Sequence, residues 1–240
     1  MKVAYKTDVG KQRTHNEDSI LIDICMGIFL LADGLGGHQA GEVASNLAVK
    51  ESYTYLKENL NKVKSEGEVL ELLTESLLKA HNTIRAKSMT DINLMGMGTT
   101  LIQMLIKDSS AYICHVGDSR VYFFREEIKQ ITKDHTFENY LMEDEIIQRE
   151  CLPLQKLHIL TQAVGESETI VPELKQIKLK AEDMLLACSD GLTDMLSGKE
   201  LESIIYQYRD NLNTVVDSLI KEANNKGGMD NISVILIKYE

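Results

Sequence analysis

Apolar side chains recur with a helical period along two long stretches of the chain. Residues 41–60 and 68–88 place Val, Ala and Leu side chains three or four positions apart, so each stretch has one apolar face. This spacing predicts two long amphipathic helices. A second helical pair is expected near the C-terminus, at about 198–208 and 212–224. The helices are therefore expected in two separate pairs.

Shorter apolar runs between polar turns predict strands. The expected strands cover residues 28–32, 99–106, 111–116, 120–124, 184–188 and 232–238. Short turns at 107–110 and 117–119 are typical of antiparallel hairpins. Strands are grouped with strands and helices with helices. This grouping favours antiparallel sheets covered by helices over a regular βαβ alternation.

Composition agrees with a globular chain and limits its partners. The 240 residues include 43% hydrophobic and 26% charged side chains, and no repeat or linker-like tract divides them. At this length one domain over residues 1–240 is the default expectation, and two domains are possible. The 26 basic and 37 acidic side chains give a net charge of −11, which argues against nucleic acid or an anionic membrane as the main partner.

Two further features indicate a cytoplasmic protein. The N-terminal residues are too polar for a secretory signal, and no apolar run approaches the ~20 residues that a membrane span needs. The four cysteines are far apart and form no C-x-x-C motif, so neither a zinc ribbon nor a redox pair is indicated. Cys25, Cys114 and Cys188 lie in apolar runs and are expected to be buried.

Acidic residues stand where predicted strands begin or end. They are Glu17, Asp18, Asp33, Asp118, Asp190 and Asp230. Any one of them, taken alone, is most simply a turn residue whose carboxylate bonds its own backbone. If the strand ends meet, however, these carboxylates repel by roughly 1 kcal/mol per pair at ~4 Å even in bulk water, and stay ionised only around cations. Oxygen ligands without His or Cys favour Mg²⁺, Mn²⁺ or Ca²⁺.

The residues around Asp33 argue against other phosphate chemistries. A dinucleotide fingerprint would need glycine at the position of Gln39, and no Gly-Lys-Ser/Thr segment exists for a P-loop. An aspartyl-phosphate hydrolase would need a second aspartate two residues before Asp33 or Asp190. Leu31 and Cys188 occupy those positions. A cation site therefore remains the favoured interpretation.

The chain resembles the metal-dependent protein serine/threonine phosphatases of the 2C type, in their short bacterial form. Seven segments carry the resemblance in the family's order, at residues 7–19, 32–45, 96–101, 116–120, 133–135, 188–192 and 227–234. The resemblance spans the whole chain. It implies an α+β fold, namely a four-layer α-β-β-α sandwich of two antiparallel sheets flanked by antiparallel helix pairs.

The resemblance also implies a single phosphatase catalytic domain over residues 1–240. This domain would carry a flap-like excursion at about 136–165, beside the active site. Residues 143–147 and 151–154 of the excursion depart from the sequence usual in the family. Substrate preference is therefore not predicted from the resemblance.

A centre for two Mn²⁺ or Mg²⁺ ions is implied as the cofactor. Asp33 would bridge the two ions, and the Gly34 carbonyl oxygen would bind one of them. The other implied ligands are Asp190 and Asp230 at the first ion, Glu17 and Asp18 at the second, and Asp118 with Asp190 at a third, weaker ion. Asn231 would orient Asp230.

The implied reaction is direct attack on phosphorus by a hydroxide that bridges the two ions. Arg13 is the candidate to bind the phosphate, because its planar guanidinium matches phosphate oxygens and it lies four residues before Glu17. His38 is the candidate general acid for the leaving serine or threonine oxygen, with a role in holding the turn as the alternative.

Phosphorylated proteins are the implied substrates, and a bacterial Ser/Thr kinase is the implied opposing enzyme. We expect a monomer. Two alternatives stay open: a non-catalytic phosphoprotein-binding or metal-sensing module on the same fold, and an enzyme dedicated to one developmental regulator. The first alternative would predict a lost carboxylate at position 33, 190 or 230, and all three are present.

Overall fold

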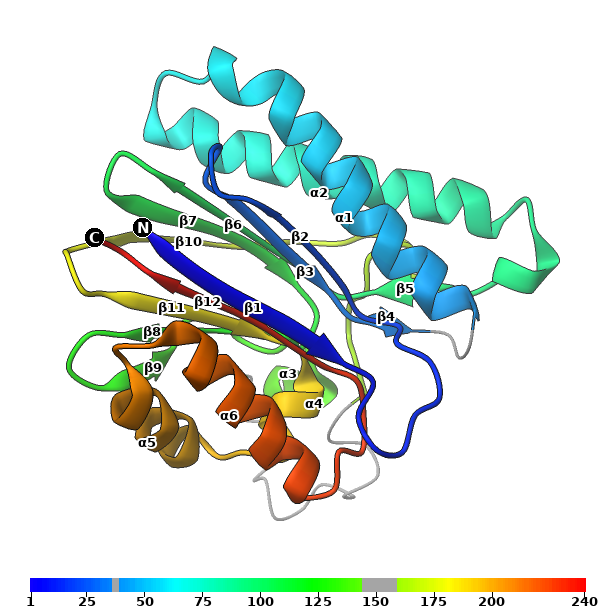
Figure 1. The fold of residues 1–240 in the computed structure, drawn as a ribbon. Coiled ribbons are helices and arrows are strands. Elements are labelled where there is room, and N and C mark those ends of the chain that lie inside the picture. The colour runs from blue at the N-terminus through cyan, green and yellow to red at the C-terminus, as the bar shows by residue number, and fades with distance from the viewer. Residues whose placement is uncertain (36–38, 144–158) are drawn as a thin grey trace.

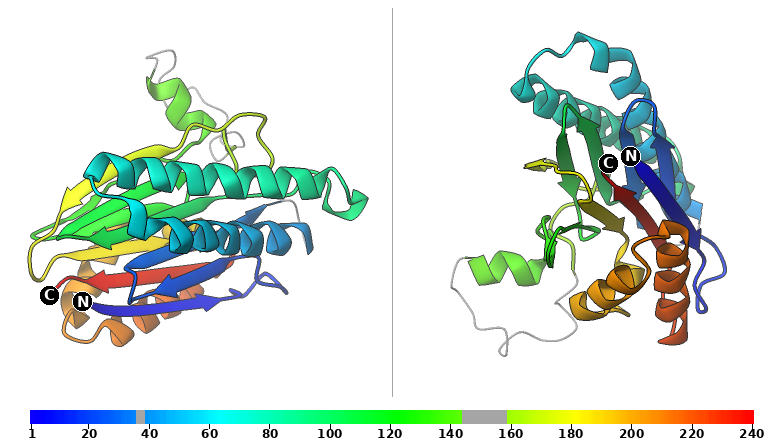
Figure 2. Two further views of the ribbon diagram at one scale, coloured as in Figure 1. Left: turned by 90° about the horizontal axis from the view of Figure 1, so that it is seen from above. Right: turned by 60° about the vertical axis from the view of Figure 1, so that its left-hand side comes forward.

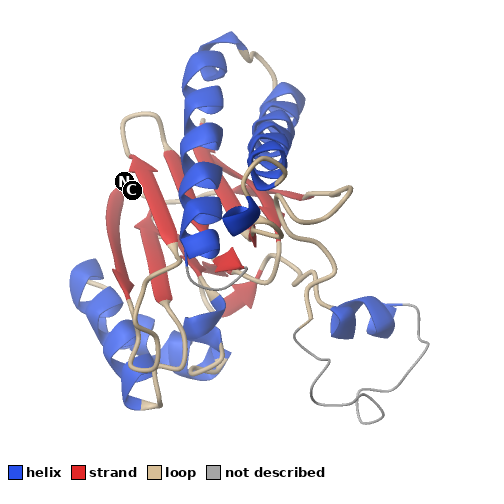
Figure 3. Ribbon diagram, turned by 90° about the vertical axis from the view of Figure 1, so that its right-hand side faces the viewer, coloured by secondary structure: helices blue, strands red, loops and turns tan. Residues whose placement is uncertain are grey.

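Two five-stranded antiparallel sheets lie face to face in the computed structural model, which describes residues 1–35, 39–143 and 159–240. Helices cover the outer face of each sheet (Figures 1 and 3). The layers therefore follow the order helix, sheet, sheet, helix. This arrangement confirms the predicted α-β-β-α sandwich.

Each sheet is antiparallel throughout. The first sheet has the order β1 (Lys2–Asp8), β12 (Ile232–Lys238), β11 (Met184–Cys188), β8 (Arg120–Phe124) and β9 (Ile128–Gln130). The second has the order β10 (Glu173–Lys178), β7 (Ser110–Val116), β6 (Leu101–Lys107), β3 (Ile28–Ala32) and β2 (Ser19–Asp23). A two-stranded ladder joins β4 (Gly34–Leu35) to β5 (Gly98–Thr99).

The helices pack as the two predicted pairs (Figure 2). The second sheet is covered by α1 (Gln39–Asn59) and α2 (Glu66–Ser88), with the short turns η1 (Leu60–Lys62) and η2 (Ile92–Leu94). The first sheet is covered by α5 (Gly198–Tyr208) and α6 (Leu212–Asn225), next to the single turn α4 (Asp190–Thr193). Helix α3 (Phe137–Glu143) stands apart from both pairs.

Local sequence explains where these helices begin. The Ser65 hydroxyl accepts a hydrogen bond from the Glu68 N–H and caps α2. A capping box between Ser197 and Glu200 starts α5. The Asn211 side chain accepts from the Thr214 N–H at the start of α6. Each cap satisfies a backbone donor that the first helical turn leaves without a partner.

Three apolar layers hold the sandwich together, one between the sheets and one under each helix pair. Strands such as β3 are buried along their whole length, because one face meets the other sheet and the opposite face meets helices. Phe29 points into the layer between the sheets, whereas Leu30 belongs to the layer under the helices. Full burial of such a side chain contributes roughly 1.5–3 kcal/mol.

One of the two predicted hairpins is wrong. The turn at 107–110 does join β6 to β7, and Asp108 and Ser109 take the positive φ angles of 49° and 57° that such a tight turn needs. The turn at 117–119 instead carries the chain from one sheet to the other. Both edges of β7 are already occupied, by β6 and β10, so β8 pairs with β11 and β9. The crossing bends at Gly117, whose φ is 114°.

The expectation that the cysteines are buried is met only in part. Cys114 and Cys188 are buried, but Cys25 is exposed in the tight turn between β2 and β3. None of the described helices is long and apolar enough to cross a membrane. The predicted excursion at 136–165 is described only at its two ends, and residues 144–158 lie outside the described part of the chain.

Candidate metal centre

The strand registers explain why the acidic residues come together. In the first sheet, the ends of β1 and β11 lie beside the beginnings of β12 and β8. In the second sheet, the ends of β3 and β7 lie beside the beginnings of β2 and β6. The crossing at 117–119 joins the end of β7 to the beginning of β8. The strand ends that precede or follow the acidic residues therefore share one end of the sandwich.

Asp33 lies at the centre of the acidic group. Burial is the main cause that raises its pKa well above the ordinary 3.8, and the charges of Asp18, Asp190, Asp118 and Asp230 raise it further. Its backbone is fixed by two hydrogen bonds to Thr100, at 2.8 Å from the Thr100 N–H and 3.0 Å to the Thr100 hydroxyl. The neighbouring carboxylates thus surround a rigid strand end.

Three further aspartates share this electrostatic stress. Burial raises the pKa of Asp18 to about 7, that of Asp118 to about 7 and that of Asp190 to about 6, with a contribution from neighbouring acidic groups in each case. One oxygen of Asp18 and one of Asp190 are buried without any hydrogen-bond partner. Buried polar atoms of this kind are rare in native proteins and suggest that something outside the chain satisfies them.

Arg13 forms an ion pair with this group. Its guanidinium Nη2 lies 2.7 Å from a carboxylate oxygen of Asp230. Both side chains are partly exposed, at 48% for Arg13 and 34% for Asp230. The pair therefore sits at the mouth of the acidic group, where a phosphate could approach.

Glu17 and Gly34 meet in a close-packed backbone crossing. A Cβ atom at Gly34 would lie 2.7 Å from the Glu17 carbonyl oxygen and 2.3 Å from that of Gly41. A Cβ atom at Gly41 would lie 1.8 Å from a carboxylate oxygen of Glu17. Glycine is needed at both positions because any side chain would displace the backbone or the carboxylate.

Asn231 ties the loop that carries Glu17 to the loop that carries Asp230. Its amide oxygen accepts from the Glu17 N–H at 2.8 Å, and its amide nitrogen donates to the Val9 and His15 carbonyls, both at 2.9 Å. The Asn231 N–H donates to Asp230 at 2.8 Å. Asn231 thereby fixes Asp230 and Glu17 relative to one another.

The oxygen donors of this group fit hard divalent cations, but their side chains do not form an assembled coordination site. Among the described residues, no three His, Cys, Asp or Glu side chains already form a group that could hold a metal ion. Local bonds explain this, since Arg13 holds Asp230, and the Ser189 hydroxyl donates to Asp18 at 2.8 Å. The unpartnered oxygens and the all-oxygen chemistry still match the ligands that Mg²⁺ and Mn²⁺ prefer.

Comparison with known proteins decides the family. The family model described as "Protein phosphatase 2C" matches residues 10–229. The chain belongs to the protein phosphatase 2C family. It is 35% identical to protein phosphatase PhpP of Streptococcus pneumoniae over 243 residues, which cover 99% of this chain and 97% of PhpP.

Solved phosphatases share the whole fold. The S. agalactiae serine/threonine phosphatase is 31% identical and superposes with a TM-score of 0.90, covering 100% of this chain and 99% of the other. The catalytic domain of the phosphatase PstP, solved in complex with two manganese ions, is 32% identical with a TM-score of 0.83, covering 98% and 96%. The 2C-type fold is therefore shown along the full length of the chain.

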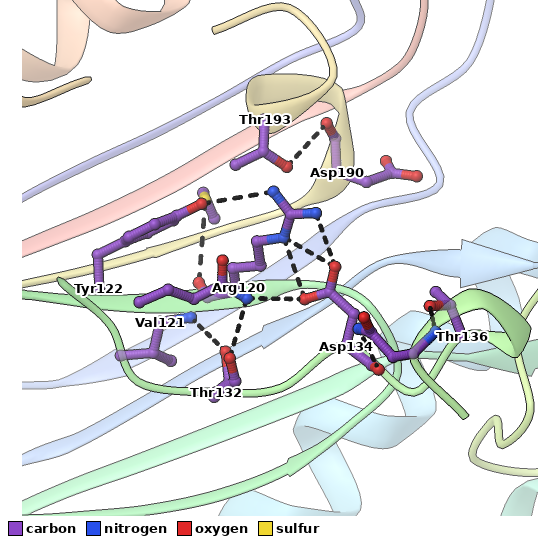
Figure 4. A network of polar contacts seen from close by, with 11 residues as sticks. Arg120, Val121, Tyr122, Thr132, Asp134, Thr136, Asp190 and Thr193 are labelled. Atoms are coloured by element: carbon purple, nitrogen blue, oxygen red, sulfur yellow. Dashed lines mark hydrogen bonds and ion pairs between the residues drawn. The ribbon is translucent and has the colours of Figure 1, made fainter. Parts of the chain in front are cut away.

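An ion pair that the motif analysis did not single out lies beside the 2C-type acidic group (Figure 4). The Arg120 Nη2 donates to a carboxylate oxygen of Asp134 at 2.6 Å, and Nε donates to both oxygens at 3.0 and 2.9 Å. Gln130 donates to the same carboxylate at 3.0 Å. Asp134 and Arg120 both lie in segments that carry the family resemblance. Their place in these segments is the only feature of the sequence that points to them.

His135 forms a second link between the same two segments. The backbone N–H of His135 donates to the Gly117 carbonyl at 2.8 Å. The imidazole Nδ1 of His135 accepts from the Gly117 backbone N–H at 3.1 Å. The loop that carries Asp118 is therefore fixed to the beginning of the excursion. The predicted general acid His38 lies outside the described residues, directly before α1.

Proposed function

We propose that this chain is a metal-dependent protein serine/threonine phosphatase that hydrolyses phosphoserine and phosphothreonine on proteins. The supporting observation is a group of mutually repelling carboxylates, in which Asp18 is buried and Asp33, Asp118 and Asp190 are partly buried. Two members of the group have oxygens without partners. Such a group is costly unless cations neutralise it. Family membership links this chemistry to phosphomonoester hydrolysis.

The ligand roles follow the family pattern. Asp33 and the Gly34 carbonyl oxygen would be the central ligands of a centre that holds two Mn²⁺ or Mg²⁺ ions. When bound, the two ions supply an activated water and neutralise charge on the phosphate. The remaining ligands are Asp190 and Asp230 for the first ion, Glu17 and Asp18 for the second, and Asp118 with Asp190 for a third, weaker ion.

Arg13 has two partners in this proposal. In the structure its guanidinium pairs with Asp230, and in the substrate complex it donates to the phosphate oxygens. The exchange is inexpensive because both side chains are partly exposed, so the pair is screened by solvent. Asn231 keeps Asp230 in place while Arg13 moves.

Other parts of the proposal rest on the sequence and on the family resemblance. His38 acts as general acid, and residues 1–240 form one catalytic domain with a flap-like excursion at about 136–165. The substrates are phosphorylated proteins, and a Ser/Thr kinase in the same cell opposes the enzyme. The protein works as a monomer in the cytoplasm.

A phosphopeptide assay tests this function. We expect phosphate release from a phosphothreonine peptide with Mn²⁺, none with EDTA, and near-complete loss in Asp190→Asn. Glu66→Gln is the matched control, because it removes an exposed carboxylate that pairs with Lys178, at the end of β10 that lies beside the beginning of β7 and away from the acidic group. Full activity of Asp190→Asn would contradict the proposal. Tight phosphopeptide binding without turnover would instead indicate a non-catalytic module.

A further inference from the structure

A shallow, open cavity of about 430 Å³ is lined by residues of β1, of the loop after it and of α6. Figure 1 labels β1 and α6, which contact each other. Lys6 and Asp8 line the cavity from β1. Because they are two residues apart in a strand, their side chains lie on the same face of β1, the face that α6 covers. Asp217 and Lys221 reach the cavity from α6, where residues four apart share one face. Lys11 completes the charged lining from the loop after β1.

Three lysines and two aspartates give this lining a formal charge of +1, in a chain whose net charge is −11. Both aspartates already have partners. Lys6 lies 2.5 Å from Asp217, and Asp8 accepts from the Gly10 N–H at 2.9 Å. Asn224 donates to the same Asp8 oxygen at 3.1 Å.

Among the described residues, Lys11 and Lys221 are the lysines of the lining without an ion pair, and Asp8 is hydrogen-bonded only to the neutral Gly10 N–H and Asn224 amide. Both lysine side chains are exposed. Within residues 1–35, 39–143 and 159–240, no carboxylate lies at ion-pair distance from either ammonium group. An anion entering the cavity would therefore find two cations without competing for them.

The cavity and the candidate phosphate site are built on the same two loops. The Gly228 carbonyl accepts from the Lys11 N–H at 2.8 Å and from the Gln12 N–H at 3.1 Å. Two residues further along each loop, Arg13 pairs with Asp230. The Cα atoms of Lys11 and Arg13 are thus at most ~7 Å apart, given ~3.3–3.6 Å per extended residue.

We propose that this cavity binds an anionic side chain of the substrate protein, close in sequence to the phosphorylated residue. The inference rests on the proposed phosphatase function and names a substrate class for it. An extended peptide rises ~3.3 Å per residue, so an anion about two to four residues from the phosphoresidue reaches Lys11 and Lys221. The anion is a carboxylate or a second phosphate, which share this chemistry.

Matched phosphothreonine peptides test the inference with wild-type protein and Mn²⁺. One peptide carries glutamates at the flanking positions on both sides, and the other carries glutamines. We expect kcat/KM to be about fivefold higher for the glutamate peptide, through a lower KM, since each exposed ion pair contributes modestly. The preference is expected to disappear between about 0.05 M and about 1 M NaCl, where screening becomes strong. A third peptide with a second phosphothreonine distinguishes phosphate from carboxylate as the preferred anion.

Charge-reversed variants locate the effect. Lys11→Glu and Lys221→Glu are each expected to reduce or invert the preference for the glutamate peptide. Lys129→Glu is the matched control, because Lys129 is an exposed lysine on β9, at the opposite edge of the same sheet from β1. It should leave the preference unchanged.

The outcomes separate this inference from the function on which it rests. Equal kcat/KM for the two peptides, with both hydrolysed, would overturn the inference and leave the phosphatase function intact. A preference that survives in both Lys11→Glu and Lys221→Glu would also overturn it. Failure to hydrolyse any peptide would contradict the proposed function itself.

Discussion

Asp118 and Asp134 differ in the partner that each carboxylate has, although the same short segment of chain carries Asp118 and the arginine that binds Asp134. Figure 4 shows Asp134 with that arginine, Arg120. Asp134 is 7% exposed and receives three hydrogen bonds from Arg120. Among the described residues, no cationic nitrogen lies at ion-pair distance from Asp118. Burial and the nearby charge of Asp190 raise the pKa of Asp118 to about 7.

The difference separates structural from functional acidic residues. The charge of a buried carboxylate that pairs with an arginine is neutralised within the chain, and removing the carboxylate leaves an unpaired cation. A buried carboxylate without a cation is incomplete, and its ionised form needs a charge from outside the chain. Asp118 shares this condition with Asp18, Asp33 and Asp190. We therefore expect opposite effects when the two kinds of aspartate are neutralised.

The largest effect is expected for Asp33→Asn. Metal-dependent phosphatase activity should fall by about a thousandfold or more, because the central ligand of the two ions is lost. In EDTA the same variant should unfold at a higher temperature than wild type, since Asp33 adds to the repulsion among buried acids. Activity assays and thermal melts check both results. A lower melting temperature in EDTA would contradict the comparison.

Asp134→Asn should destabilise the protein, whereas Asp33→Asn should stabilise it in EDTA. Loss of the carboxylate leaves Arg120, whose side chain is 28% exposed, without its partner, and we expect a loss of about 3 kcal/mol in unfolding free energy. Urea unfolding measures it. The matched control is Asp217→Asn, which breaks the exposed pair with Lys6 and should cost less than about 0.5 kcal/mol. Equal losses of unfolding free energy in the two variants would show that the Arg120–Asp134 pair contributes no more to stability than an exposed ion pair.

Metal removal should make stability depend on pH. Folding raises the pKa values of Asp18 and Asp118 from 3.8 to about 7 and that of Asp190 to about 6. Between pH ~4 and ~7 the folded state then binds more protons than the unfolded state, so stability falls as pH rises. Bound cations keep these carboxylates ionised in the folded state, which removes the effect.

Thermal melts from pH 5 to 8, with EDTA or with saturating Mn²⁺, check this prediction. The melting temperature in EDTA should decrease with pH, and the decrease should be smaller with Mn²⁺. Asp118→Asn should reduce the slope in EDTA because it removes one of the titrating groups. Identical slopes in the two conditions would argue that cations do not bind these carboxylates.

Interior strands were predictable from the sequence and edge strands were not. All six predicted strands lie inside a sheet, as β3, β6, β7, β8, β11 and β12. The four edges are formed by β1, β9, β10 and β2. An edge strand exposes much of its length, as in β10, where every residue is exposed or partly exposed. The edge strand β2 carries only the short apolar run 20–22, and all five of its residues are partly exposed.

The same contrast applies to the candidate site. Strand ends mark Asp33 and Asp190, because an apolar run stops at an acidic residue that the strand geometry then fixes. The partner of Arg120 could not be predicted, because Asp134 lies fourteen residues away and no periodic pattern links the two. The crossing at 117–119 was mistaken for a hairpin, since a short turn does not indicate which sheet the next strand joins.

The smallest predicted effect concerns Ser189, which is hydrogen-bonded to Asp18. Its hydroxyl donates to Asp18 at 2.8 Å and accepts from the Ser233 N–H at 2.9 Å, so it supplies Asp18 with one of its few donors. Ser189→Ala should raise the Mn²⁺ concentration for half-maximal activity by about tenfold, as expected when a residue that orients a ligand is removed. Turnover at saturating Mn²⁺ should change much less.

Ser110→Ala is the matched control for this variant. Ser110 is also fully buried, but its hydroxyl accepts from Lys178 at the end of β7 remote from the acidic group. Its loss is expected to lower stability without changing the Mn²⁺ requirement. If both variants shift the Mn²⁺ requirement equally, the effect follows from general destabilisation, and Ser189 does not position Asp18 for the metal. If only Ser189→Ala shifts the Mn²⁺ requirement, the Ser189 hydroxyl positions Asp18 for the metal. Asp18 would then depend on a neutral donor where Asp134 has the cationic side chain of Arg120.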